Sequence, residues 1–90
     1  MDTKNLHLVV VSPEKTLFDG VINWVELPGE MGRFQVLLNH AALISSLQAG
    51  NVVFQKGEAH YRVKRDTQTI EIKGGFVEVK DNIVSVCVEQ

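Results

Sequence analysis

The three histidines are candidates for metal binding or proton transfer, because an imidazole can bind a metal or move a proton near neutral pH. They are His7, His40 and His60, and none has a second metal ligand two to four residues away. Cys87 is the only cysteine, so neither a cysteine-rich zinc site nor an internal disulfide can form. The sequence therefore predicts no metal site. It indicates surface positions for His7 and His60 and a half-buried apolar position for Cys87.

His40 differs from the other histidines because it lies beside Asn39 within an otherwise apolar stretch, Leu38 to Ala42. Such a setting favours a buried imidazole that forms hydrogen bonds inside the protein. Contact with a partner is the second interpretation, and catalysis is the weakest of the three. We therefore expect His40 to organise its own loop.

Motifs for nucleophilic catalysis and for phosphate binding are absent from the sequence. No serine lies in a Gly-x-Ser-x-Gly elbow. Gly29-Glu30-Met31-Gly32 is rich in glycine, but no Gly-Lys-Ser/Thr follows and Glu30 is acidic, which favours a plain turn. No two carboxylates form a close pair inside an apolar stretch, as an acid and base for catalysis would. The residues thus predict no enzyme and no bound cofactor.

A small carrier domain of the lipoyl or biotinyl type is the alternative to an interaction module. Such a domain presents a modified lysine at a hairpin tip, within Asp-Lys-Ala or Met-Lys-Met. Lys56 and Lys80 lie near predicted tips, but their neighbours are Gln55 and Gly57 in one case and Val79 and Asp81 in the other. A mass increase on either lysine would support the carrier hypothesis.

The charge and apolar content describe one small intracellular domain spanning residues 1–90. Nine basic residues are scattered among eleven acidic ones, giving a net charge of -2. That balance does not favour binding to nucleic acid or to an anionic membrane surface. The longest apolar run, Leu8 to Val11, is too short to cross a bilayer. We therefore expect no membrane insertion.

Short apolar runs between turn residues predict an all-β protein. Val and Ile are abundant, and several runs alternate apolar and polar residues, so that each run has one face suited to a core. Turn residues recur between the runs, a spacing typical of a sandwich or barrel. The runs are Leu6–Val11, Val21–Leu27, Val52–Phe54, Tyr61–Val63, Ile70–Ile72, Val77–Val79 and Val84–Val88.

Two turn signals in the last third of the chain predict specific backbone shapes. Asp81-Asn82 supplies residues that tolerate a positive φ, so the flanking runs should form a tight hairpin. Across Gly74-Gly75 the apolar positions change from even to odd numbers, which predicts a glycine β-bulge.

The segment Ala41 to Leu47 leaves its secondary structure open. Leu43, Ile44 and Leu47 have helical spacing, and Asn39 could cap the start of a helix. A short helix and an extended segment are equally compatible with this pattern.

Five short motifs follow one another in order along nearly the whole chain. They are Leu8–Glu14 with Leu17–Gly20, Val25–Gly29 with Gly32, Asn39–Ile44, Leu47–Gly50, and Gly74–Val79 with Asn82–Val86. This order resembles the N-terminal domain of the ATP synthase epsilon subunit family, with its Phe-x-Gly, Gly/Asn-His-Ala-Pro-Leu and Gly-Gly-Phe-x-Glu-Val motifs. Each motif alone is weak, but five in one order are specific.

The resemblance implies a flattened β-sandwich of two sheets with about ten short strands, at the foot of the central stalk of a bacterial F-type ATP synthase. It also implies two partners, the gamma subunit and the rotor ring of c subunits, at the cytoplasmic face of the inner membrane. Such a chain couples proton flow to ATP synthesis without being a catalyst and without binding a nucleotide.

The resemblance further implies which residues contact each partner. Ser12 and Ser45 match the gamma-binding positions. The ring-binding surface is expected to be one bottom edge, where glycines let the backbone approach a partner. Its residues are Gly29, Glu30, Met31, Gly32, Arg33, Asn39, His40 and Ala41.

This chain departs from the family pattern in three respects. Leu38 and Ala42 stand where the family has prolines, so the loop around His40 is less restricted. Arg33 stands where the family often has an acid, so charge pairing with the ring is expected to differ. The chain ends at Gln90 without the family's C-terminal pair of helices, so control of ATP hydrolysis is not assigned to it.

Overall fold

The computed structural model describes residues 4–58 and 67–90, which contain eight strands and no helix. The all-β prediction is confirmed, although the described residues hold eight strands where the resemblance implied about ten. The predicted run Tyr61–Val63 and the surface position of His60 lie outside the described residues. Within the described ranges, no helix is long and apolar enough to cross a membrane. The strands are β1 (Leu6–Val11), β2 (Thr16–Gly29), β3 (Gly32–Val36), β4 (Leu43–Leu47), β5 (Gly50–Lys56), β6 (Gln68–Ile72), β7 (Gly74–Lys80) and β8 (Ile83–Glu89).

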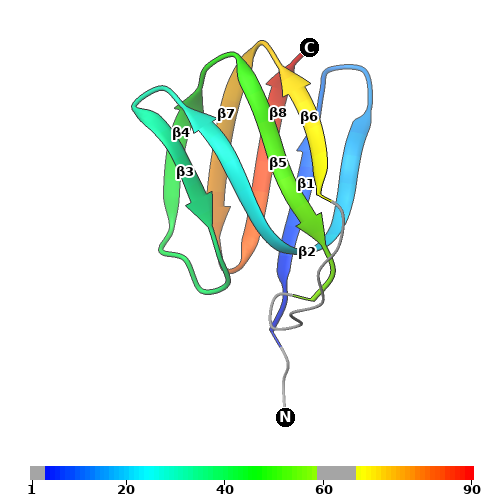
Figure 1. Cartoon of the computed structure of the whole chain (residues 1–90), viewed down its shortest axis with the longest axis vertical. Coiled ribbons are helices and arrows are strands. Elements are labelled where there is room, and N and C mark those ends of the chain that lie inside the picture. The colour runs from blue at the N-terminus through cyan, green and yellow to red at the C-terminus, as the bar shows by residue number, and fades with distance from the viewer. Residues whose placement is uncertain (1–3, 59–66) are drawn as a thin grey trace.

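The strands form two packed layers (Figure 1). The front layer has the order β3-β2-β5-β6, and the back layer has the order β4-β7-β8-β1. All pairs are antiparallel except β1 with β8. The first half of β2 pairs with β1 and its second half with β3 and β5, with a register shift between Ile22 and Trp24. This one long strand therefore joins the two layers of the predicted sandwich.

The core between the layers is entirely apolar, because no polar or charged side chain among the described residues is buried. Alternation produces it: Leu6, Leu8 and Val10 of β1 are buried, and the residues between them are half exposed. Full burial of a side chain of this size contributes about 1.5–3 kcal/mol. The fold is therefore held by its hydrophobic core.

The turn between β7 and β8 has the predicted tight form. Asp81 and Asn82 have φ values of 51° and 63°, and Lys80 pairs with Ile83 across the turn. Two consecutive positive φ values define the two-residue hairpin turn whose twist matches that of the strands. The hairpin prediction is confirmed.

The glycine β-bulge predicted at Gly74-Gly75 is wrong. The register of β7 is continuous with both β4 and β8, without a shift. The apolar parity changes because the chain passes from β6 in the front layer to β7 in the back layer at this point. Gly75, at φ 149°, is required there because a Cβ would overlap the carbonyl oxygen of Cys87.

The segment after His40 is a strand, so the helix considered for it, with Asn39 as its cap, is wrong. β4 pairs with β7 along its whole length, from Leu43 with Val79 to Leu47 with Gly75. The side chain at position 45 lies on the inner face between those of Leu43 and Leu47, but it is a serine, which conceals the alternation. Asn39 lies in a turn with φ 66°.

Candidate partner-binding surfaces

The turn between β2 and β3 is a rigid tip. Gly29 pairs with Gly32, and a Cβ on Gly29 would lie 2.8 Å from the Gly32 carbonyl oxygen, so only glycine fits. The backbone N–H of Glu30 donates to the carbonyl of Ser46 in β4 at 3.1 Å, which ties the tip to the back layer. Met31 is completely exposed. The tip can thus contact a partner without rearrangement.

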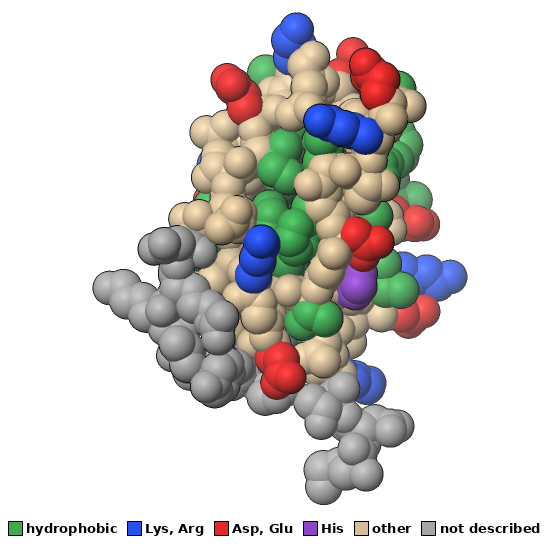
Figure 2. Space-filling view, turned by 90° about the vertical axis from the view of Figure 1, so that its right-hand side faces the viewer, with side chains coloured by type: hydrophobic (Ala, Val, Ile, Leu, Met, Phe, Trp, Pro, Cys, Tyr) green, Lys and Arg blue, Asp and Glu red, His purple; other side chains and the backbone are tan. Residues whose placement is uncertain are grey.

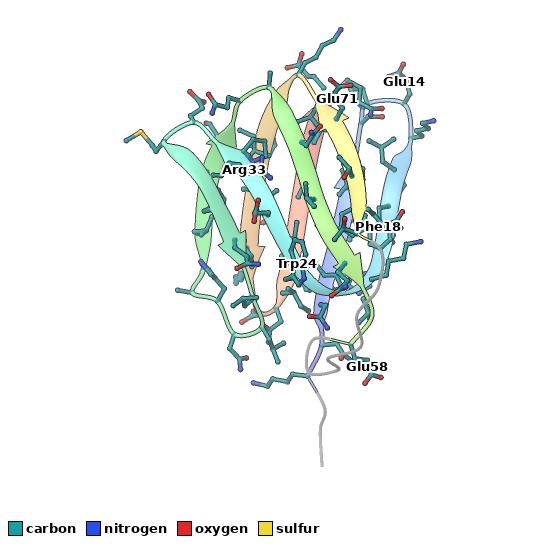
Figure 3. The ribbon with its side chains drawn as sticks, viewed as in Figure 1. Glu14, Phe18, Trp24, Arg33, Glu58 and Glu71 are labelled. Atoms are coloured by element: carbon teal, nitrogen blue, oxygen red, sulfur yellow. The ribbon has the colours of Figure 1, made fainter. Side chains whose placement is uncertain are left out.

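Arg33 lies next to this tip but does not offer a free charge. Its Nε donates to Oε1 of Glu26 at 3.0 Å, and both side chains are about two-fifths exposed. The pair joins β3 to β2 on the outer surface of the front layer, where Figure 3 labels Arg33. An exposed ion pair of this kind contributes at most about 1 kcal/mol. Glu30, the acidic residue of the tip, has no hydrogen-bonded side-chain partner among the described residues.

The loop from β3 to β4 carries Asn39, His40 and Ala41. His40 is half buried, which corrects the expectation of a buried imidazole. Its Nδ1 donates to the carbonyl of Ala41 at 2.8 Å, and its backbone N–H donates to Leu37 at 3.1 Å. His40 therefore does form hydrogen bonds within its own loop, from a partly solvated position.

A pair of asparagines joins this loop to the β7–β8 turn. The backbone N–H of Asn39 donates to Oδ1 of Asn82 at 2.6 Å, and Nδ2 of Asn82 donates to Oδ1 of Asn39 at 3.1 Å. Both residues border an open polar hollow of about 460 Å³, together with Lys4, His40 and Asp81. The loop is thus fixed to a rigid turn.

The residues predicted to bind the ring follow the length of one edge strand, and the structure does not gather them at one end. The β2–β3 tip and the Asn39–Ala41 loop lie at opposite ends of β3 (Figure 1), roughly 15 Å apart for a five-residue strand. Among the described residues, β3 pairs with β2 alone. The predicted surface is therefore an open edge of the front layer, bounded by two ordered turns.

The two serines predicted to bind gamma do not share one surface patch. Ser12 shapes the β1–β2 turn, since its N–H donates to the carbonyl of Lys15 at 2.8 Å and its Oγ bonds the same residue. Ser45 lies in β4, and its Oγ donates to the Ser46 carbonyl at 3.2 Å. Strands β7 and β8 separate β4 from β1. Each hydroxyl thus has a local role.

The outer face of the back layer carries an apolar surface that the sequence analysis missed. Ile44, Phe76 and Ile83 are 75%, 54% and 48% exposed. Phe76 pairs with Cys87, which pairs with Val11, so an apolar row crosses β7, β8 and β1. A shallow hollow of about 330 Å³ lies along this row and reaches Ser12. Phe76 points outward because β7 lies in the back layer and the buried side chains of that strand are those of Val77 and Val79.

On the side of the sandwich beside the first half of β2, the hydrophobic side chains are more buried than those on the outer face of the back layer. A narrow band of hydrophobic side chains runs between charged ones there (Figure 2). Leu17, Phe18 and Ile70 are half buried and pack against the core. Nζ of Lys56 lies 5.7 Å from the centre of the Phe18 ring, which Figure 3 labels. Lys56 is exposed, and its ammonium group lies near the face of the Phe18 ring.

Titratable side chains form no metal-binding group within residues 4–58 and 67–90. Nε2 of His7 contacts Oδ1 of Asp19 at 2.6 Å on the strand surface, and Cys87 is free and half buried. The positions predicted for His7 and Cys87 are therefore confirmed.

Residues 5–90 match the family described as ATP synthase, delta/epsilon chain, β-sandwich domain. The chain belongs to this family. The resemblance noted in the sequence is thus confirmed over nearly the whole chain, which leaves the carrier hypothesis without support.

Curated relatives of this delta/epsilon-family chain are named ATP synthase epsilon chain. That of Leptospira borgpetersenii is 40% identical over 86 residues, covering 96% of this chain and 62% of the relative. That of Caulobacter vibrioides is 34% identical over 84 residues, covering 93% and 90%. The chain therefore spans less than two thirds of the Leptospira protein but nearly all of the Caulobacter protein.

Two solved structures share the delta/epsilon sandwich fold. A chain of the Euglena gracilis mitochondrial ATP synthase, described with OSCP, F1 and c-ring, aligns with a TM-score of 0.81 and 16% identity, over 96% of this chain and 51% of that one. A chain of the Tetrahymena thermophila mitochondrial enzyme, described as central stalk and c-ring, aligns with a TM-score of 0.75 and 18% identity, over 100% and 67%.

Proposed function

We propose that this chain is a non-catalytic rotor subunit of a bacterial F-type ATP synthase, which joins the gamma subunit to the ring of c subunits. Through this link, rotation of the ring by proton flow reaches gamma and drives ATP synthesis. Membership of the delta/epsilon family and the bacterial epsilon chains among its relatives support the proposal. The central-stalk and c-ring descriptions of the structural relatives agree with it.

The observation that carries the proposal is that one rigid sandwich has two separate surfaces of different chemistry. One is the edge along β3, where charged and polar side chains lie beside the exposed Met31 and Leu37, with the β2–β3 tip and the Asn39–Ala41 loop at its ends. The other is the outer face of the back layer, where Ile44 and Phe76 are exposed beside Glu78 and Lys80. Because a continuous hydrogen-bonded sheet joins them through β2, a force applied to one surface is transmitted to the other.

The gamma subunit is the partner we assign to the apolar outer face. A permanent protein contact is more apolar at its centre than the rest of a protein surface, and Ile44 and Phe76 supply such a centre. Ser12 borders the hollow on this face, and Ser45 is the neighbour of Ile44 in β4. Ser12 therefore borders this surface, whereas Ser45 points to the inner face of β4, so only Ser12 keeps a place in the proposed gamma contact.

The ring of c subunits is the partner we assign to the β3 edge. Its predicted contacts are Gly29 to Arg33 at one end and Asn39 to Ala41 at the other, as the resemblance implied. The exposed side chains of this edge include Glu30, Arg33 and Asn39 together with the apolar Met31 and Leu37, so the proposed contact with the polar loops of a membrane rotor would be of mixed character. The chain would then be a peripheral part of a complex at the cytoplasmic face of the inner membrane, without inserting into the bilayer or binding nucleic acid.

Simultaneous capture of both partners tests this assignment. Immobilised chain should retain gamma and detergent-solubilised c-ring together, and Phe76→Glu should lose gamma while keeping the ring. Retention of neither partner by the wild-type chain would reject the rotor function. Loss of the ring together with gamma in Phe76→Glu would reject the separation into two surfaces.

A further inference from the structure

Asn82 connects three segments of the molecule. Its Oδ1 accepts from the backbone N–H of Asn39 at 2.6 Å, and its Nδ2 donates to Oδ1 of Asn39 at 3.1 Å. Its backbone carbonyl accepts from the N–H of His7 in β1 at 2.9 Å. One residue of a two-residue turn therefore holds both β1 and the loop that follows β3.

The loop depends on this residue because it lacks a sheet ladder of its own. Residues 37–42 lie between β3 of the front layer and β4 of the back layer, outside both strands. Among the described residues, its side-chain hydrogen bonds to another segment both go to Asn82. His40 bonds only to neighbours in the loop, Leu37 and Ala41. Leu38 packs against the core at one end of the loop, and the asparagine pair is the polar link that fixes the part next to it, Asn39 to Ala41, relative to the sandwich.

Asparagine suits both positions for two physical reasons. Asn39 and Asn82 have φ values of 66° and 63°, a left-handed conformation that asparagine adopts more readily than most residues. The side-chain amide of Asn82 also has both a donor and an acceptor, so it can bond the backbone N–H and the side-chain oxygen of Asn39 at the same time. Aspartate in place of Asn82 would keep the acceptor but lose the donor.

We propose that Asn82 is a positioning residue for partner binding, which holds the Asn39–Ala41 loop in the conformation that the rotor ring binds. This inference rests on the assignment of that loop to the ring. A loop fixed before binding loses less conformational entropy when a partner docks, so affinity rises without a new contact.

Amide hydrogen exchange tests whether the two hydrogen bonds between Asn39 and Asn82, here called the clamp, order the loop. In Asn82→Gly, glycine accepts the positive φ at no cost, so the turn is kept and only the amide is removed. The Asn39 amide should then exchange about tenfold faster, as for the loss of one hydrogen bond. Asp81→Gly is the matched control, since Asp81 has a similar φ of 51° in the same turn and takes no part in the clamp. Equal exchange in the two variants would overturn the proposal.

Binding to the c-ring tests whether that order matters to the partner. Asn82→Gly should weaken ring binding by about tenfold, while Asp81→Gly should bind within about twofold of wild type. Adding Ala42→Pro to Asn82→Gly should restore most of the affinity, because proline restricts the exposed end of the loop without replacing the amide. Unchanged affinity in Asn82→Gly, or no rescue by proline, would overturn the positioning role.

Ala41→Trp distinguishes failure of this inference from failure of the proposed function. Ala41 is exposed in the loop, and a bulky side chain there should block the ring whatever Asn82 does. Wild-type ring binding by Ala41→Trp would reject the loop as a contact and with it the role of Asn82 in binding. Blocked binding in Ala41→Trp with normal binding in Asn82→Gly would reject the positioning role alone.

Discussion

Gly29 determines the shape of the β2–β3 tip, because the space for its missing side chain is filled by the Gly32 carbonyl and the Phe34 ring, both within about 3 Å of a Cβ. Gly29→Ala should therefore destabilise the protein by about 1–3 kcal/mol, the range for overpacked sites. Gly74→Ala is the matched control, since a Cβ there lies 3.6 Å from its nearest neighbour, the Leu47 carbonyl. Urea denaturation of both variants checks this, and equal stability would contradict the steric argument.

His40 has a smaller structural role than its sequence context suggested. The imidazole is half buried and its Nδ1 forms one hydrogen bond, to the Ala41 carbonyl. His40→Ala should therefore lower the free energy of unfolding by about 0.5–1.5 kcal/mol, the net worth of one such bond. A loss of more than about 3 kcal/mol in urea denaturation would indicate that the ring is part of the core.

The Glu26–Arg33 ion pair connects strands β2 and β3, and charge exchange can measure its contribution to stability. Arg33→Glu places two carboxylates side by side and should cost about 1 kcal/mol or less, because the site is exposed. Exchanging both residues, Glu26→Arg with Arg33→Glu, should restore most of that loss. Denaturation at low and high salt measures it, and a double variant no more stable than the single one would show that the pair contributes nothing.

The exposed apolar residues on the outer face of the back layer are expected to contribute to binding of the gamma subunit. Phe76→Glu and Ile44→Glu should each weaken gamma binding by tenfold or more, since the centre of an apolar contact tolerates a charge poorly, with the melting temperature little changed because both sites are exposed. Thr69→Glu is the control, because Thr69 is an exposed residue of β6 in the front layer, and this variant should bind gamma normally. Normal gamma binding by both back-layer variants would remove this face as the contact.

Local chemistry explains which elements the sequence could predict. Asp81-Asn82 indicates its turn because the positive φ is a property of the residues themselves. The strand β4 could not be predicted from the sequence. Ser45 occupies an inward, half-buried position in this strand, and a serine there interrupts the alternation of apolar residues. The parity change at Gly74-Gly75 has two causes that look alike in sequence, a bulge or a change of layer, and only tertiary packing decides between them.

The candidate surfaces were only partly predictable for the same reason. The residues around Gly29 and Asn39 could be identified from motifs, but their arrangement along the β3 edge depends on the length and direction of that strand. The outward position of Phe76 follows from which layer β7 joins. The link from Asn39 to Asn82 spans 43 positions of sequence, and no local pattern indicates it.

The whole molecule is one body with two candidate partner surfaces. β2 crosses from one layer to the other, so the outer face of the back layer and the β3 edge belong to a single hydrogen-bonded sheet. A subunit built this way needs no active site or cofactor to transmit rotation. Its contribution to the enzyme would be the fixed distance and angle between its two partners.

Proton-driven ATP synthesis is the most direct measurement of that claim. Vesicles containing ATP synthase depleted of this subunit should synthesise ATP poorly under an imposed proton gradient, and adding the wild-type chain should restore synthesis. Chain carrying Phe76→Glu or Ala41→Trp should remain folded but fail to restore it, since each variant disrupts one of the two contacts. Full synthesis with either variant, or no restoration by the wild-type chain, would contradict the proposed role as a rotor link.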